Sequence, residues 1–312
     1  MLTYQKLINK PKTLKRFSGF SPDQFTTVVA NLLPHWELAE QIRLSRAPRK
    51  RAIGAGHPYR LRTLGDKLLV LLFWYRTNTL FEVMGWMFGL DGTNIGRLIR
   101  KLTPLLEMAV DPGLATILDR ARRKRKKIKS WEAFMKEFPD LAEVIIDATE
   151  QRRKRPGGKR AQKKGYSGKK HAHTIKTQIT VSGHGRIMDV SDSYPGRIHD
   201  KTILVKEKTL EKLPRQTRKR MDKGYDGITN AHPRCNIILP HKRRRGSPPL
   251  SRGQKRANTL RSKARILVEN TIARLKKYRI LEDKYRGNER EYNQHVRNIA
   301  ALCNFRLLYA TM

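Results

Sequence analysis

An excess of cationic side chains constrains this chain more than any other feature. Its 68 Lys and Arg stand against 27 Asp and Glu, for a net charge of +41. Such a chain repels itself unless a polyanion lies nearby. Nucleic acid is the expected partner, because each Lys or Arg placed on a phosphate releases a condensed counterion. An anionic membrane surface is the competing partner, but no dominant amphipathic segment with a basic face supports it.

Length and cysteine content narrow the class of protein further. The 312 residues suffice for two domains, at ~100–200 residues each. Cys235 and Cys303 form neither a disulfide framework nor the CxxC spacing of a zinc site. The N-terminus has no apolar signal-peptide region, and the longest apolar run, residues 68–75, is far shorter than the ~20 residues that span a bilayer. We therefore expect a cytoplasmic protein with no membrane partner.

Residues 1–118 have the pattern of an all-α region. Ser21 and Pro22 have the residue types of a helix N-cap and first helical position. Within residues 79–108, two short amphipathic helices flank a Gly-containing break at residues 89–92, which is the sequence form of a helix-turn-helix. The second helix would expose Arg97, Arg100 and Lys101 to base edges or phosphates. An ordinary helical hairpin with a solvated basic face is the alternative.

A basic linker with a short helix is expected at residues 119–139. Eight Lys and Arg lie between positions 120 and 129, and such a block is either a solvated loop or a non-specific phosphate contact.

The hydrophobic period changes from residue 140 onward. Residues 141–150, 173–182 and 186–195 read as strands, the last two joined by a Gly-His-Gly hairpin signal. Helical patterns follow at residues 198–213, 259–281 and 289–310. This order predicts an α/β fold over residues 140–312, with a mixed sheet flanked by helices. Residues 152–170 carry ten basic residues and no acidic one, so we expect a loop in which Lys169 and Lys170 contact phosphates.

Three carboxylates are the candidate chemical groups. Asp147 ends the most apolar strand, Asp222 precedes a turn, and Glu269 lies on an otherwise basic helix. At ~100° per residue, Glu269 falls with Arg265 and Lys276 on the flank of that helix's apolar stripe. Carboxylates that converge repel one another unless cations lie between them. Oxygen ligands suit Mg²⁺ or Mn²⁺, and two such ions clamp the oxygens of an in-line phosphoryl displacement.

Each of these carboxylates also has a simpler explanation. Asp147 could cap the turn after its strand, and Glu269 could be a surface partner of Arg265 at i,i+4 spacing. Asp200 is the second-choice acid in place of Asp222, because residues 215–221 are more charged than a buried strand should be.

Five stretches, in this order, resemble the DDE transposases of bacterial insertion sequences, in the group related to Harbinger-type elements. They are VIIDATE, KKGYSGKKHAHTIKTQI, YPGRIHDKTIL, DKGYDGI and ARILVENTIARLKKYRIL, and the resemblance covers roughly residues 20–308. One departure is Ser262, which stands where the family often has Tyr.

The resemblance implies a helix-turn-helix region followed by an RNase H-like nuclease core. It implies that Asp147, Asp222 and Glu269 bind two Mg²⁺ or Mn²⁺ ions, and that Arg265 and Lys276 contact DNA phosphates. It further implies a transposase that cleaves at the ends of a mobile element and joins the freed 3′-hydroxyl to target DNA. Such an enzyme would act as a homo-oligomer on DNA in the bacterial nucleoid, without a small-molecule substrate.

Two other classes of protein remain as alternatives. A non-catalytic nucleic-acid-binding protein could keep the fold without the chemistry. A ribosome- or nucleoid-associated structural protein would explain the charge, but it would not explain the strand that ends at Asp147.

Overall fold

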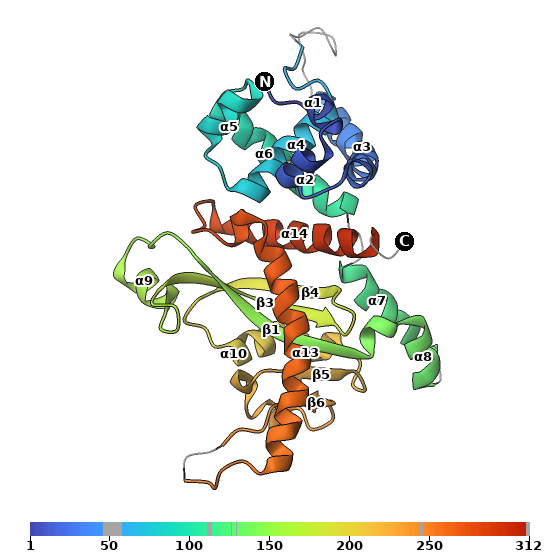
Figure 1. Cartoon of the computed structure of the whole chain (residues 1–312), viewed down its shortest axis with the longest axis vertical. Helices are drawn as coiled ribbons and strands as arrows, with labels where there is room; N and C mark the ends of the chain where they lie inside the picture. Colours follow the sequence, from blue (N-terminus) through green and yellow to red (C-terminus); the bar gives the residue numbers. More distant parts are fainter. Residues whose placement is uncertain (46–57, 111–113, 126, 129, 244–245, 310–312) are drawn as a thin grey trace. The chain divides into compact units, whose positions relative to one another are not determined.

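The computed structural model describes residues 1–45, 58–110, 114–125, 127–128, 130–243 and 246–309. The chain divides into two compact units. The N-terminal unit comprises Met1–Pro112, Lys276–Asp283 and Gln294–Met312, and the sheet unit comprises Gly113–Leu275 and Lys284–Asn293. Figure 1 shows both units and labels their main helices and strands.

The described residues of the N-terminal unit contain helices and no strand. The helices are α1 (Tyr4–Ile8), α2 (Pro11–Ser18), α3 (Pro22–Leu44), α4 (Leu64–Thr77), α5 (Phe81–Phe88), α6 (Gly92–Val110), η3 (Arg279–Leu281) and most of α14 (Glu289–Tyr309). Ser21 caps α3 as predicted: its hydroxyl accepts from the N–H of Gln24, and the Gln24 side chain accepts from the N–H of Ser21. Each bond satisfies a backbone donor that the first turn leaves unpaired.

The centre of the N-terminal unit is α4, whose residues 68–75 are all buried. The Tyr75 hydroxyl is 3.1 Å from Nδ1 of His295 on α14. The side-chain amide of Asn298 donates to the Tyr75 hydroxyl at 3.1 Å and to the Thr103 carbonyl at 2.8 Å. These buried contacts explain why residues from Gln294 group with the N-terminal unit, whereas the sequence placed them in a domain spanning 140–312.

The two helices expected within residues 79–108 are α5 and α6. The backbone turns at Gly89, which caps α5 with a φ of 68°. Glycine adopts this left-handed conformation without steric cost. The helix pair is therefore present, and its use in DNA binding stays a prediction.

A six-stranded mixed sheet forms the sheet unit. Its strands are β1 (Glu143–Arg152), β2 (Tyr166–Ser167), β3 (Ala172–Ser182), β4 (Ile187–Pro195), β5 (Arg218–Met221) and β6 (Ile237–Ile238). β3 pairs antiparallel with β1, β2 and β4, while β5 runs parallel to both β1 and β6. The predicted α/β fold with a mixed sheet is confirmed, and this architecture is consistent with an RNase H-like core.

The other described elements of the sheet unit are helices. They are α7 (Leu114–Arg125), α8 (Trp131–Glu137), η1 (Pro139–Leu141), α9 (Lys159–Gly165), α10 (Asp200–Lys206), α11 (Thr209–Lys212), η2 (Lys223–Tyr225), α12 (Ile228–Ala231) and α13 (Arg252–Lys276). The long helix α13 crosses the strands (Figure 1). Leu118 and Ala121 of α7 are buried in the same core as Val144, Ile146 and Met221. Part of the expected basic linker is therefore a helix packed on the sheet.

Two further segments differ from the sequence expectation. The helix expected at residues 198–213 is interrupted at Lys208, whose φ is 51°, so α10 and α11 are separate. The basic segment 152–170 contains α9 and β2 instead of being a plain loop. None of the described helices is long and apolar enough to cross a membrane.

Candidate active site

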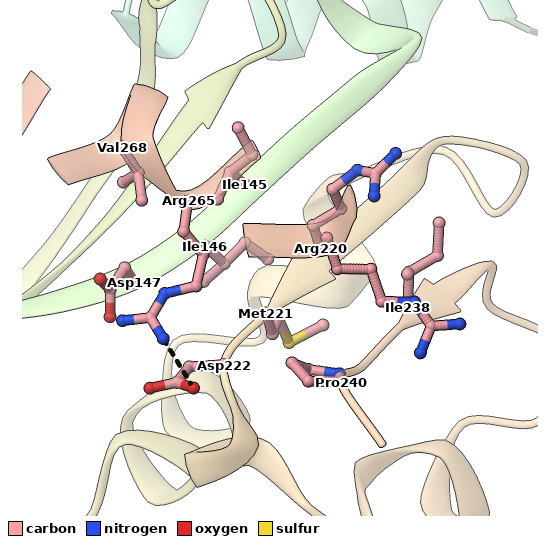
Figure 2. A pocket seen from close by; sticks show the side chains of 11 residues that line it. Ile145, Ile146, Asp147, Arg220, Met221, Asp222, Ile238, Pro240, Arg265 and Val268 are labelled. Carbon is pink, nitrogen blue, oxygen red and sulfur yellow. Dashed lines mark hydrogen bonds and ion pairs between the residues drawn. The ribbon is translucent and has the colours of Figure 1, made fainter. Parts of the chain in front are cut away.

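Strand pairing brings Asp147, in the middle of β1, next to Asp222, at the end of β5. β1 and β5 are parallel, with Ile146 opposite Met221. Asp147 continues β1, and Asp222 directly follows the last residue of β5 and caps η2. Together with Arg265 they line a small pocket with an apolar wall that includes Ile145, Met221 and Val268 (Figure 2).

The surroundings of the Asp147 carboxyl shift its pKa upward. Burial raises the pKa of Asp147, and the negative charges of Asp222 and Asp200 raise it further. A 2.8 Å hydrogen bond from the N–H of Ala148 and the charge of Arg265 act in the opposite direction. The ionised carboxylate is therefore under-compensated, and an additional cation nearby would stabilise it.

Arg265 on α13 links the other two predicted acids. Its Nη1 lies 3.3 Å from Oδ1 of Asp222 and its Nη2 lies 3.4 Å from Oε1 of Glu269. In Figure 2 the guanidinium lies between Asp147 and Asp222. The Glu269 side chain is 56% exposed and does not line the pocket. The simpler explanation of Glu269, an i,i+4 pair with Arg265, thus describes the contact that is present.

The carboxylate oxygens of this site are suitable ligands for a divalent ion, but the three carboxylates are too far apart to bind one together. Asp147, Asp222 and Glu269 offer carboxylate oxygens, the ligands that Mg²⁺ and Mn²⁺ prefer. Among the described residues, however, no three His, Cys, Asp or Glu side chains are close enough together to hold a metal ion. The Arg265 guanidinium supplies the positive charge between the acids.

Asp200, the second-choice acid, begins α10 and is paired internally. Its Oδ1 is 2.9 Å from Nζ of Lys176, and the same ammonium lies 3.3 Å from Oε1 of Glu150. Burial opposes ionisation of Glu150, but hydrogen bonds from Ser167 and the charge of Lys176 lower its pKa. Asp200 and Asp222 each have a protein cation beside them, but Asp222 directly follows β5, which pairs with β1 up to the residue before Asp147. The choice of Asp222 stays a prediction.

Sequence reasoning did not single out Tyr225, which ends η2. Its ring is fully buried, and its hydroxyl has no hydrogen-bond partner among the described residues. Burial raises the pKa of Tyr225 well above its usual value, and Asp200, Asp147 and Asp222 raise it further. The charges of all three aspartates therefore act on the Tyr225 hydroxyl. Its position three residues after Asp222 was the available signal.

The predicted DNA-binding side chains lie in several environments. On α6, Arg97 and Arg100 bond within their own helix, to Asn94 and to the Gly96 carbonyl. Lys101 pairs with Glu40 and lies 4.2 Å from the ring centroid of Trp36.

The other predicted DNA-binding lysines lie outside α6. Lys169 and Lys170 are exposed between β2 and β3. Lys276 ends α13, belongs to the N-terminal unit and is 2.9 Å from Glu282.

Comparisons with known proteins agree on one family. The DDE superfamily endonuclease family matches residues 146–304. A protein of Microchaete diplosiphon, described as a transposase for insertion sequence element IS702, is 28% identical over 309 residues, covering 95% of each chain. A protein of Streptomyces albus G, described as a transposase for insertion sequence element IS112, is 24% identical over 276 residues, covering 88% of each chain. No solved structure matches the chain at a significant level.

Proposed function

Because this chain belongs to the DDE superfamily endonucleases, we propose that it is the transposase of an insertion sequence. The two relatives described as transposases align over nearly the whole chain, which supports a shared activity. The observation that carries the proposal is the parallel register that sets Asp147 beside Asp222, with Arg265 linking Asp222 to Glu269. The narrower Harbinger-type grouping stays a prediction.

The proposed reaction needs two divalent cations, which Asp147, Asp222 and Glu269 would hold. The bound ions would supply Lewis-acid stabilisation of the attacking and leaving oxygens. The residues of this chain have separable roles. Asp147 is fixed by the sheet, whereas Glu269 is exposed and pairs with Arg265, a contact that it would have to leave to share an ion with the aspartates. Arg265, once released, is free to bind a phosphate of the DNA next to the cut.

The chemistry is two successive phosphoryl transfers on DNA. First, a water oxygen attacks the phosphorus at the end of the element and the bond to the 3′-oxygen breaks, which leaves a 3′-hydroxyl. That hydroxyl then attacks a phosphodiester of the target, and the displaced 3′-oxygen leaves. Neither step forms a protein–DNA bond.

DNA contact is proposed for the basic side chains outside the pocket. Arg97 and Arg100 on α6, and Lys169 and Lys170 beside β3, are candidates for phosphate contact. Lys101 and Lys276 would first have to leave Glu40 and Glu282. Because two ends of an element must be processed together, we propose that the active form is a homo-oligomer on DNA.

A cleavage assay tests this function. Labelled DNA with the element's own ends is incubated with Mg²⁺ or Mn²⁺ and wild-type protein, Asp147→Asn, Glu269→Gln or the control Glu211→Gln. Glu211 is exposed on α11 and lies outside the pocket. Wild type and control should cut the DNA. Asp147→Asn and Glu269→Gln should cut it more slowly, by roughly hundredfold or more, and still bind it. Asp222→Asn and Asp200→Asn, assayed in parallel, identify the second acid.

The non-catalytic alternative is favoured by one observation, the lack of a three-ligand group among the described residues. It predicts that wild-type protein binds DNA and cuts with neither ion. That result would contradict the proposed function.

A further inference from the structure

A basic hollow lies on the sheet unit apart from the acidic pocket. Its volume is about 720 Å³, within the range of pockets that hold one small organic ligand. Four cations, one aromatic ring and one imidazole line it: Arg155, Lys159, Lys163, Arg197, Tyr166 and His173. No acidic side chain lines it, so it suits an anion.

Hydrogen bonds within the α9 segment and the pairing of β2 with β3 position the walls of this hollow. Arg155 donates to Oε1 of Gln162 at 2.8 Å, and the Gln162 amide donates to the Pro156 carbonyl at 3.0 Å. These two bonds attach the loop before α9 to the helix itself. Tyr166 on β2 is paired in register with His173 on β3. Both walls are therefore positioned by the protein's own bonds.

Tyr166 adds a feature that phosphate binding alone does not require. Tyr166 is 44% exposed, and its ring meets the His173 ring edge-to-face, with centroids 5.7 Å apart at 74°. The buried Nδ1 of His173 has no hydrogen-bond partner among the described residues. An exposed aromatic ring among cations combines the two contacts that a nucleotide makes, stacking of the base and pairing of the phosphate.

The hollow lies beyond the C-terminal end of β1, where Arg152 pairs with Thr174, the neighbour of His173. Arg152, the last residue of β1, is five residues from Asp147, which is roughly 17 Å along a strand. Arg197, which also lines the hollow, precedes Ile198, whose carbonyl accepts from Lys176 at 2.9 Å. A DNA strand whose phosphate lay near Asp147 could reach the hollow within a few nucleotides.

We propose that this hollow binds one unpaired nucleotide of the DNA, with its base against Tyr166 and its phosphate on Lys159 and Lys163. The proposal rests on the proposed function only in taking DNA as the substrate. An unpaired nucleotide is required because a base inside a duplex has both faces covered by its neighbours. Arg155 and Arg197 neutralise the flanking phosphates.

Binding to two duplexes of the same sequence tests the proposal, one fully paired and one with a single extra unpaired nucleotide. The full chain is used in EDTA, so that no strand is cut. Wild-type protein should bind the second duplex several-fold more tightly. Tyr166→Ala should remove this preference, with a loss of about tenfold for the unpaired duplex. Tyr166→Phe should keep it, because stacking needs the ring and not the hydroxyl.

Helix α9 offers a matched control for the charges. Lys159 and Lys163 line the hollow, while Arg160 and Lys164 are exposed on the same helix and do not. Lys159→Ala/Lys163→Ala should weaken binding of the unpaired duplex more than Arg160→Ala/Lys164→Ala, at equal loss of charge. These exposed positions also test the proposal if Tyr166→Ala fails to fold.

Three results would overturn the proposal: equal affinity of wild-type protein for both duplexes, a preference that survives Tyr166→Ala, or equal losses in the two double variants. Failure of the proposed function is seen separately. A protein that prefers the unpaired nucleotide but never cuts element ends keeps the hollow and loses the transposase assignment. A protein that cuts those ends without preferring the unpaired nucleotide keeps the transposase assignment and loses the proposal for the hollow.

Discussion

The side chain of Lys219 shows how a charged strand can be buried. Lys219 on β5 has no exposed surface, and its ammonium donates to the carbonyls of Pro214, Arg215 and Thr217 at 2.6, 3.1 and 2.9 Å. Burial lowers its pKa to about 8. The next residue, Arg220, is 2.8 Å from Glu143. Each charge in this strand therefore has a partner, which removes the objection to β5 as a core strand.

The buried His295 should make the folding stability of the N-terminal unit depend on pH. Burial lowers the pKa of His295 to about 4, below its ordinary value near ~6.5. Between these values the unfolded chain binds more protons, so stability is complete above pH ~6.5 and falls as the pH drops toward ~4. His295→Gln should lose less stability than wild type over this interval, by on the order of 2–3 kcal/mol.

The measurement for His295 is denaturant unfolding at about pH 7 and pH 4.5. Tryptophan fluorescence is a suitable signal, because the Trp74 ring centroid lies 5.1 Å from that of His295. An equal loss of stability in wild type and variant between the two pH values would show that His295 does not titrate in this way.

At the scale of elements, the turn between β4 and α10 depends on one close approach. The N–H of Gly196 donates to the Thr174 carbonyl at 3.0 Å. A Cβ on Gly196 would lie 1.8 Å from the Thr174 hydroxyl oxygen, which itself donates to Glu150 at 3.0 Å. The absence of a side chain at Gly196 therefore lets this turn pack against the start of β3.

Gly196→Ala should destabilise the sheet unit by roughly 1–3 kcal/mol, because the added methyl group has to displace Thr174. Gly157→Ala is the matched control, since no atom lies within 4 Å of a Cβ at Gly157. Its effect should stay within about 0.5 kcal/mol. Urea unfolding of the two variants compares them directly, and equal stability would show that the turn moves away without cost.

At the scale of the whole molecule, the net charge of +41 predicts self-repulsion that salt can screen. The Debye length falls from about 30 Å at 0.01 M to about 8 Å at 0.15 M. The Tm of the protein alone should therefore rise with NaCl, by roughly 2–4 °C for each kcal/mol of repulsion removed.

The same salt series with saturating duplex DNA should reverse the trend. DNA stabilises the folded protein by mass action, and this contribution weakens as salt competes for the phosphates. Differential scanning fluorimetry measures both series. A Tm that falls with salt in the absence of DNA would show that attractive ion pairs outweigh the repulsion.

Local sequence patterns were sufficient to predict many of the helices and strands. The strand that contains Asp147, the hairpin of β3 and β4, the Ser21 cap and the long helices α13 and α14 all follow from the period and residue types of one segment at a time. Asp147 does not end its strand as expected, because β1 continues to Arg152 through its pairing with β3. The family was also readable from short motifs in order, and the comparison with known families confirms it. In the site, Asp147, Asp222 and Arg265 were named from sequence, and they line one pocket.

The amino-acid sequence by itself therefore determined the charge, the class of fold, the family and the candidate acids, because each depends on composition or on neighbours along the chain. Only the tertiary structure decided the contacts between distant segments. These include the register that sets Asp147 beside Asp222, the carbonyls that bury Lys219, the grouping of α14 with the N-terminal unit, and the basic hollow around Tyr166. Strand register and helix packing depend on surfaces that meet only after the chain folds back on itself, and no single segment encodes them.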